Sequence, residues 1–210
     1  MKKGTYIMMH SGTLAGWTAE TDTPTLNDLI LGMSRMPRFA GQTRIPYTVL
    51  DHSLFACAMA QDEAPGVYAL QLAVLMHDAH EAMTGDVPTP FKDDKLREIQ
   101  RVLDRKISSL VCLNQCDCLF TDHDALIKMY DLRALRAEAL VIAAPALMTP
   151  ELVAEHFGVA PEQKDVERLR GYVSDLNTDE KKSRLFAAMV NVLRTSRDAQ
   201  GNRPGEGDPK

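Results

Sequence analysis

Apolar residues recur along most of this chain at the three- and four-residue spacing of amphipathic helices. The pattern predicts helices in eight places, with Pro37 and Pro145 ending two of them: 25–36, 48–62, 66–83, 92–112, 122–144, 150–157, 162–173 and 178–195. Residues 4–20 instead mix Thr, Tyr, Ile, Trp and Gly, which favours a small β-hairpin. The sequence therefore predicts an all-α fold with a minor β element near its N-terminus.

One domain is expected for residues 1–195. The 210 residues suit a single domain and suffice to bury a core, and no internal repeat divides them. Residues 196–210 have almost no apolar side chains, so we expect a disordered C-terminal tail there.

Composition and charge narrow the class of protein. The formal net charge of −5 argues against a broad nucleic-acid-binding face, so an anionic small molecule such as a nucleotide would depend on local positive charge. No apolar run approaches the roughly 20 residues that a membrane helix needs. The first residues lack the pattern of a signal peptide, so we expect a cytoplasmic protein without membrane or nucleic-acid partners.

The segment LAVLMHDAHEAMTGDVPTPFK, residues 72–92, combines an apolar run with several polar groups. In a continuous helix Glu81 lies one turn beyond His77 and Asp78, so all three side chains share one wall. Buried charges usually need a partner or a metal. The alternative is a helix whose acidic end reaches solvent near Thr84 and Gly85.

Two other helical segments carry matching residues. His52 lies on the apolar pattern of one helix, and Asp131 lies between Tyr130 and Leu132 in another. A lone His on such a face is more often a satisfied core residue. Together with the His-Asp pair, however, these residues make a set of two histidines and two carboxylates from three helices. Such ligands suit Zn, Mn, Co, Fe or Ni.

The order H…HD…D resembles that of the HD-domain metal-dependent phosphohydrolases. Three strings within residues 25–144 resemble the branch that holds bacterial 5′-deoxynucleotidases and phage deoxyadenylate phosphohydrolases: RFAGQTRIPYTVLDHS, HDAHEAMTGDVPTPFK and YDLRALRAEA. The resemblance implies an HD-domain helical bundle that binds one divalent transition metal, Co, Zn or Mn, through His52, His77, Asp78 and Asp131. It further implies additional Mg²⁺ with a triphosphate substrate and a homo-oligomer, a dimer or a hexamer.

The same resemblance implies roles for residues around the metal. Glu81 is expected to orient or deprotonate the attacking water, and Asp86 to contact that water or protonate the departing sugar oxygen. Arg38 offers a planar fork for phosphate oxygens. The chemistry of two further residues, and not the resemblance, leads us to expect that Phe39 packs against the sugar or base and that Lys92 adds local positive charge for the substrate. For Arg38 the alternative is a surface cation beside a helix end.

The favoured function is hydrolysis of 2′-deoxynucleotides to deoxynucleoside and phosphate. The string RFAGQTRIPYTV is closer to the phage enzymes, which makes deoxyadenosine nucleotides, dATP or dAMP, the first choice. A broad 5′-deoxynucleotidase acting on monophosphates stays open, as does an HD hydrolase of another phosphate ester, such as a cyclic dinucleotide or an alarmone. A metal-stabilised helical module without activity is the third possibility, although it has no need of Glu81, Asp86 or Arg38.

Three cysteines cluster at Cys112, Cys116 and Cys118, with His123 close behind. A second zinc site is conceivable there, but C-x3-C-x-C is not a usual zinc-binding spacing. Reduced thiols are the favoured interpretation and fit a reducing compartment. Cys57, in the helix of His52, is expected in the core.

Overall fold

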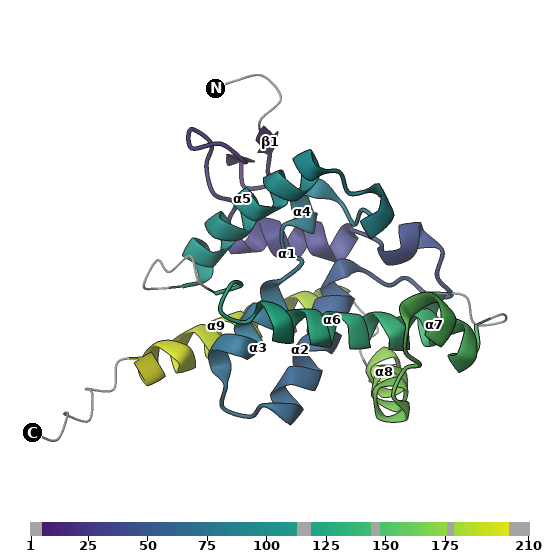
Figure 1. The fold of residues 1–210 in the computed structure, drawn as a ribbon. Coiled ribbons are helices and arrows are strands. Elements are labelled where there is room, and N and C mark those ends of the chain that lie inside the picture. The colour runs from purple at the N-terminus through teal and green to yellow at the C-terminus, as the bar shows by residue number, and fades with distance from the viewer. Residues whose placement is uncertain (1–5, 113–118, 144–147, 176–178, 202–210) are drawn as a thin grey trace, which may run out of the picture.

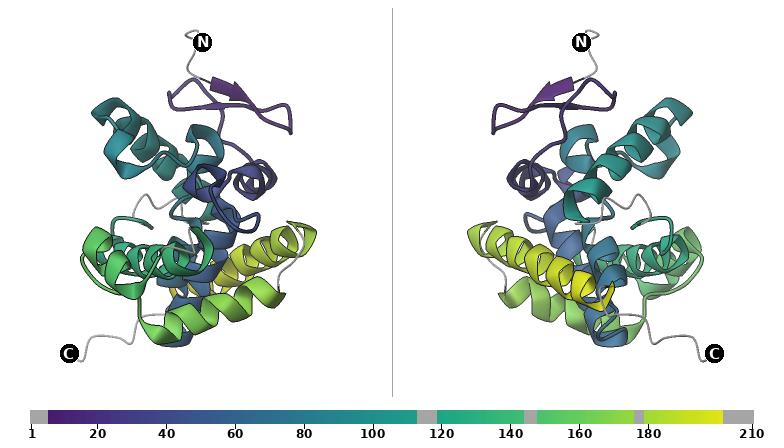
Figure 2. Two further views of the ribbon diagram at one scale, coloured as in Figure 1. Left: turned by 90° about the vertical axis from the view of Figure 1, so that its right-hand side faces the viewer. Right: turned by 90° about the vertical axis from the view of Figure 1, so that its left-hand side faces the viewer.

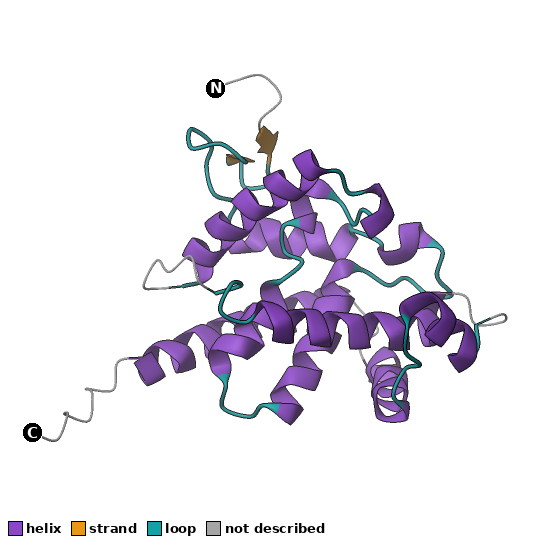
Figure 3. Cartoon of the chain, in the orientation of Figure 1, coloured by secondary structure: helices purple, strands orange, loops and turns teal. Residues whose placement is uncertain are grey.

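The computed structural model describes residues 6–112, 119–143, 148–175 and 179–201, and helices dominate it (Figures 1 and 3). Strands β1 (Tyr6–Met8) and β2 (Leu14–Gly16) pair antiparallel. The all-α class and the N-terminal hairpin predicted from the sequence are both confirmed. Within the described ranges, no helix has the length and apolar character needed to cross a membrane.

The α-helices follow the predicted order. They are α1 (Leu26–Arg35), α2 (Val49–Glu63), α3 (Tyr68–Met76), α4 (Glu81–Thr84), α5 (Asp94–Val111), α6 (Asp124–Glu138), α7 (Pro150–Phe157), α8 (Gln163–Asp175) and α9 (Asp179–Gly201). Two 3₁₀ turns, η1 (Arg38–Gly41) and η2 (Thr89–Phe91), lie in the connections, and α6 continues into a π-helical turn, η3 (Ala139–Ala143).

The predicted helix 66–83 is interrupted, which corrects the sequence expectation. Between α3 and α4 the amides of Ala79, Glu81 and Ala82 bond to carbonyls three residues back, as in a tight 3₁₀-like turn. The backbone angles at His77 and His80 stay in the helical region, so apolar periodicity cannot reveal the change. The polar side chains of residues 77–81 therefore project from a junction between two helices, and not from one continuous helix face.

The C-terminal helix is longer than expected. It ends at Gly201, six residues beyond the predicted end at residue 195, and the rest of the predicted tail, 202–210, lies outside the described residues. The added segment is polar, but Arg, Ala and Gln are good helix formers, and extending an existing helix costs less than starting one. Depletion of apolar residues alone therefore misplaced this boundary.

Helix α2 lies at the centre and contacts α1, α3, α6, α8 and α9. Its N-terminus is fixed by a capping box in which Thr48 and Asp51 exchange hydrogen bonds. In Figures 1 and 2, α1 and α5 lie on the side of the hairpin, and α8 lies on the opposite side. The core runs along the buried faces of α1, α2, α3 and α6 and is closed by α8 and α9.

The short helix α4 packs closely against α1. A Cβ atom on Gly32 would lie only 2.7 Å from the Cβ of Ala82, so this approach requires glycine. Because Ala82 follows Glu81 directly, the contact also fixes where Glu81 lies relative to α1.

Replacing Gly32 with Ala should therefore lower the free energy of unfolding by about 1–3 kcal/mol, because overpacking outweighs the better helix propensity of Ala. Gly171 offers a matched control, since it is exposed on α8 and an added Cβ would meet no atom within 4 Å. Gly171→Ala should stabilise the protein by about 0.5–1 kcal/mol. Urea unfolding measures both values, and stabilisation by both substitutions would contradict the close contact.

Candidate metal centre

Three segments far apart in the sequence bring together the predicted ligands. His52 comes from α2, His77 and Asp78 from the turn after α3, and Asp131 from α6, with one ligating atom of each within 4.8 Å of the others. The Nε2 atom of His52 lies 3.3 Å from Nε2 of His77 and 3.2 Å from Oδ1 of Asp131. Oδ2 of Asp78 lies 3.3 Å from Nε2 of His77.

The other ring nitrogens explain why these atoms face one another. Nδ1 of His52 lies 2.7 Å from the carboxylate of Glu138, and Nδ1 of His77 lies 2.7 Å from the carbonyl oxygen of Val74. Both partners accept hydrogen bonds, so each neutral ring carries its proton on Nδ1 and presents a lone pair on Nε2. In this state no hydrogen atom lies between the two Nε2 atoms. Two nitrogen lone pairs that face each other beside two carboxylates are a donor set that fits a divalent cation.

The electrostatics of the cluster agree with this donor set. Burial and Arg38 lower the pKa of His52, but the carboxylates of Glu138 and Asp131 raise it more, to about 9. Burial would raise the pKa of Asp131, yet its hydrogen bonds to both histidines hold that pKa below its ordinary value. Positive charge is thus strongly favoured where these side chains meet, and a metal can replace the protons.

Sequence reasoning missed Glu138. It is fully buried near the C-terminal end of α6, where it accepts hydrogen bonds from Tyr47 at 2.9 Å and from Arg38 at 3.4 Å, in addition to its contact with His52. A signal was present, since Glu138 lies seven residues after Asp131 and two helical turns place both on one face. Its carboxylate contacts the Nδ1 side of the His52 ring, which is how carboxylates orient histidines that bind metals.

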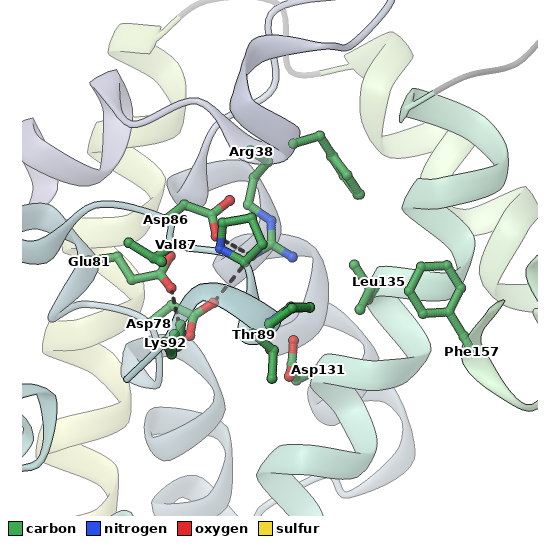
Figure 4. A pocket seen from close by; sticks show the side chains of 13 residues that line it. Arg38, Asp78, Glu81, Asp86, Val87, Thr89, Lys92, Asp131, Leu135 and Phe157 are labelled. Carbon is green, nitrogen blue, oxygen red and sulfur yellow. Dashed lines mark hydrogen bonds and ion pairs between the residues drawn. The ribbon is translucent and has the colours of Figure 1, made fainter. Parts of the chain in front are cut away.

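A cavity of about 350 Å³ opens beside the cluster, and two of the four predicted ligands, Asp78 and Asp131, line it (Figure 4). Asp131 has a third of its side chain exposed, against none for His52, so the cluster is accessible mainly from the side of α6. The cavity is lined by Arg38, Phe39, Asp78, Glu81, Asp86, Val87, Pro88, Thr89, Pro90, Lys92, Asp131, Leu135 and Phe157. All five non-ligand residues chosen from the sequence are in this lining.

Arg38 is buried at the edge of the metal cluster. Its guanidinium lies 3.6 Å from Asp78, 3.7 Å from Asp86 and 3.4 Å from Glu138, and only 7% of the residue is exposed. Burial opposes its charge, but these carboxylates hold its pKa above the ordinary value. The structure excludes the alternative of a surface cation and makes Arg38 a fixed positive charge in the cavity wall.

Glu81 begins α4 and is 2% exposed. Burial and the charges of Asp78 and Asp86 raise its pKa to about 8. Its Oε1 atom lies 3.5 Å from Nζ of Lys92, whereas its buried Oε2 has no hydrogen-bond partner in the described part of the chain. A carboxyl group with a pKa near neutrality can both accept and release a proton. Lys92, predicted to bind substrate, is thus also the charge partner of Glu81.

The opposite wall of the cavity is apolar. Figure 4 shows Leu135 and Phe157 facing Glu81 and Asp86 across the pocket. Phe39 also lines the cavity and has a positive φ of 54°, which is rare for a bulky residue. Such a backbone persists only where the surroundings hold it, and it places the ring within 5.7 Å of the Arg38 guanidinium.

The predictions for the cysteines can be compared with the structure only in part. Cys57 is buried in α2, as expected, and its thiol donates to the carbonyl oxygen of Gln71 at 3.3 Å. Cys112 is buried, while Cys116 and Cys118 lie outside the described residues. The interpretation of this cluster as reduced thiols stays a prediction.

No family model matches the chain. Over 90 residues it is 30% identical to the uncharacterized protein YfdR of Escherichia coli (strain K12), a match that covers 43% of this chain and 46% of YfdR. The chain thus spans about half the length of the curated relative that it matches. Among solved structures, the cyanophage S-2L HD phosphohydrolase DatZ, bound to dA and one catalytic Zn²⁺ ion, is 19% identical, with a TM-score of 0.47 over 84% of this chain and 99% of that chain.

Glu138→Gln tests the support behind the histidine. An amide can still contact Tyr47 but lacks the charge that orients His52, so metal affinity should fall by about 10–100-fold while the protein stays folded. Chelator competition with elemental analysis measures the affinity. Glu98→Gln, an exposed substitution on α5, is the control and should change nothing. Unaltered metal affinity in Glu138→Gln would remove this role.

Proposed function

We propose that this chain is a metal-dependent phosphohydrolase of the HD-domain type that acts on 2′-deoxynucleotides, with deoxyadenosine nucleotides as the preferred substrates. One observation carries the proposal: a cluster of two histidines and two carboxylates, with His52 buried and the other three half-buried, opens into a cavity whose wall also holds Arg38 and Glu81. The three sequence strings that resemble the deoxynucleotide branch supply these same residues.

His52, His77, Asp78 and Asp131 would hold one divalent transition metal, Zn, Co or Mn. Such an ion lowers the pKa of bound water and polarises a phosphoryl oxygen when it has an open position. Asp131 is partly exposed and lines the cavity, so an open position of the ion would face the cavity. The anionic substrate and the water would meet there.

The chain's own residues divide the remaining work. Arg38 binds phosphoryl oxygens, since its guanidinium is fixed at the cavity wall. Glu81 takes a proton from the attacking water, because its buried carboxyl has one unpaired oxygen and a pKa of about 8. We assign Asp86, on the same wall, to the departing sugar oxygen and Lys92 to the charge of the phosphate chain.

Apolar residues in the cavity would contact the nucleoside part of the substrate. Leu135 and Phe157 form a surface suited to a base, and Phe39 lies where a sugar next to the Arg38-bound phosphate would pack. The preference for adenine rests on the resemblance of RFAGQTRIPYTV to the phage enzymes. Additional Mg²⁺ with a triphosphate, a dimeric or hexameric assembly and a cytoplasmic location stay predictions from the sequence.

The alternatives differ in what they require. A metal-stabilised module without activity does not account for a buried Glu81 whose Oε2 is unpaired within the described residues, because such a group costs stability. A broad monophosphatase or a hydrolase of another phosphate ester would use the same centre. Product analysis separates these two from the proposed function.

Glu81→Gln should retain one metal ion per chain at the centre of His52, His77, Asp78 and Asp131, yet lose about 10²–10⁴-fold in kcat. An amide cannot accept the proton from water. Elemental analysis and steady-state kinetics measure the two effects. Glu167→Gln, exposed on α8, is the control for loss of a charge. A fully active Glu81→Gln enzyme would exclude the role given to this residue.

Substrate selectivity is tested with dAMP, AMP, dATP and ATP in the presence of Co²⁺, Mn²⁺, Zn²⁺ or Mg²⁺. Deoxyadenosine should be the nucleoside released, with about 10²-fold preference over the ribose form, because excluding one hydroxyl is worth a few kcal/mol at most. Phe39→Ala should relax that preference. Phe91→Ala is the matched control, since Phe91 is 78% exposed and outside the cavity lining. Equal rates on ribose and deoxyribose substrates would favour the broader phosphohydrolase.

A further inference from the structure

A second cavity, of about 430 Å³, lies beside the connection between α1 and α2. Its lining comes entirely from residues 34–48, and none of its lining residues also lines the cavity of the metal cluster. Its volume is in the range of cavities that bind small molecules, about 300–1,000 Å³. The proposed function gives this second cavity no role.

The two cavities differ in charge. Four carboxylates and two cations, Arg38 and Lys92, line the cavity of the metal cluster. Two arginines, Arg35 and Arg44, line the second cavity, and its lining includes no carboxylate. This local positive charge is opposite in sign to the formal net charge of the chain, −5. Positive charge gathered in a hollow of the surface attracts anions.

Arg35 is available for a ligand. It is exposed in the last turn of α1, and within the described residues its guanidinium takes part in no hydrogen bond or ion pair. A cation at the C-terminal end of a helix is favoured by the helix dipole, so this position alone does not indicate a binding site. The second arginine in the lining of the same cavity is not explained by the dipole of α1.

Arg44 is held in place by η3. Its Nη2 donates to the carbonyl oxygen of Val141, and its backbone amide donates to the carbonyl oxygen of Ile142 at 3.1 Å. Both acceptors are neutral, so within the described part of the chain no carboxylate compensates the charge of this guanidinium. Arginine has five N–H donors, and one contact to a carbonyl leaves others for phosphate oxygens.

The loop that carries Arg38 is closed at its base and strained at η1. Pro37 and Thr48 pair as an antiparallel bridge between the end of α1 and the start of α2. Within η1, Phe39 and Ala40 have φ of 54° and 51°, which residues with a side chain rarely adopt. Such a backbone persists only where its surroundings hold it. A contact that holds this loop therefore affects how Arg38 is presented to the metal cluster.

We propose that Arg35 and Arg44 bind a phosphate-bearing anion in the second cavity, and that this anion fixes the loop of η1. Arg35 precedes the base of the loop, whereas Arg44 lies within the loop and is anchored to η3, so one anion held by both joins three parts of the fold. Guanidinium groups match pairs of phosphate oxygens. Two of them suit a polyphosphate chain, either free or as part of a nucleotide. This binding site does not depend on the proposed function.

Calorimetric titration of the full chain with inorganic tripolyphosphate tests the site. Metal is removed first, because tripolyphosphate itself chelates metal ions and because the carboxylates of the metal cluster then repel anions. One tripolyphosphate per chain should bind. Arg35→Gln and Arg44→Gln should each weaken binding by about 10–100-fold, since charge-assisted hydrogen bonds are lost. Lys92→Gln, in the first cavity, and Arg105→Gln, exposed on α5, are the controls and should bind as the unmutated chain does.

Hydrogen exchange tests the effect on the loop. Saturating tripolyphosphate should slow exchange of the backbone amides of residues 38–47 by about 5-fold or more in the unmutated chain, and not in Arg35→Gln. Titration with ATP distinguishes the two sources of the ligand. Tighter binding of ATP than of tripolyphosphate would identify a nucleotide, and equal binding an inorganic polyphosphate, and both results support the site.

Thermal unfolding checks that the metal-free chain and each variant are folded. The site would be overturned if the folded, unmutated chain bound no tripolyphosphate, or if folded Arg35→Gln and Arg44→Gln variants bound it equally well. Unchanged hydrogen exchange despite binding would overturn the effect on the loop. None of these results bears on the proposed function, because the metal cluster is not involved in them.

Discussion

The buried carboxylate of Glu138 is the interaction on which the rest of the site depends. It lies on α6 and accepts hydrogen bonds from Tyr47, from Arg38 and from the ring of His52 on α2. Burial raises its pKa, but the charges of His52 and Arg38 raise the stability of the ionised form more, so that its pKa is below the ordinary value. One carboxylate thereby orients a ligand, fixes the cavity arginine and joins two helices. Removing any of its partners would leave a buried charge without full compensation.

Much of the fold could be predicted because local sequence signals mark where its helices begin and end. Thr25, Thr48 and Thr149 each accept a hydrogen bond from an amide in the first turn of the helix that follows, and proline appears beside several helix ends. The junction at 77–80 could not be predicted, because its backbone stays near the helical region and only its hydrogen bonds change. The extension of α9 was missed for a different reason, since a polar helix continues from an ordered one without an apolar face.

The candidate site, too, could be predicted only in part. The four proposed ligands were recognisable as residue types, and the fold brings them together. Glu138 was missed because it acts through another side chain, and a carboxylate on a helix looks like any solvated acid until its partner is placed.

Gathering this many carboxylates in one cavity opposes folding, because each loses hydration and repels the others. Burial, together with the charges of Asp78 and Asp86, raises the pKa of Glu81, whereas His77 lowers the pKa of Asp78 although burial raises it. A divalent cation held by the four proposed ligands would reverse this balance, since it would bind the folded arrangement of α2, α6 and the α3–α4 junction and not the unfolded chain. Its binding free energy would then add to stability by mass action. The same negative charge that opposes folding would favour a cation at this centre, so the proposed metal would also stabilise the packing of the central helices.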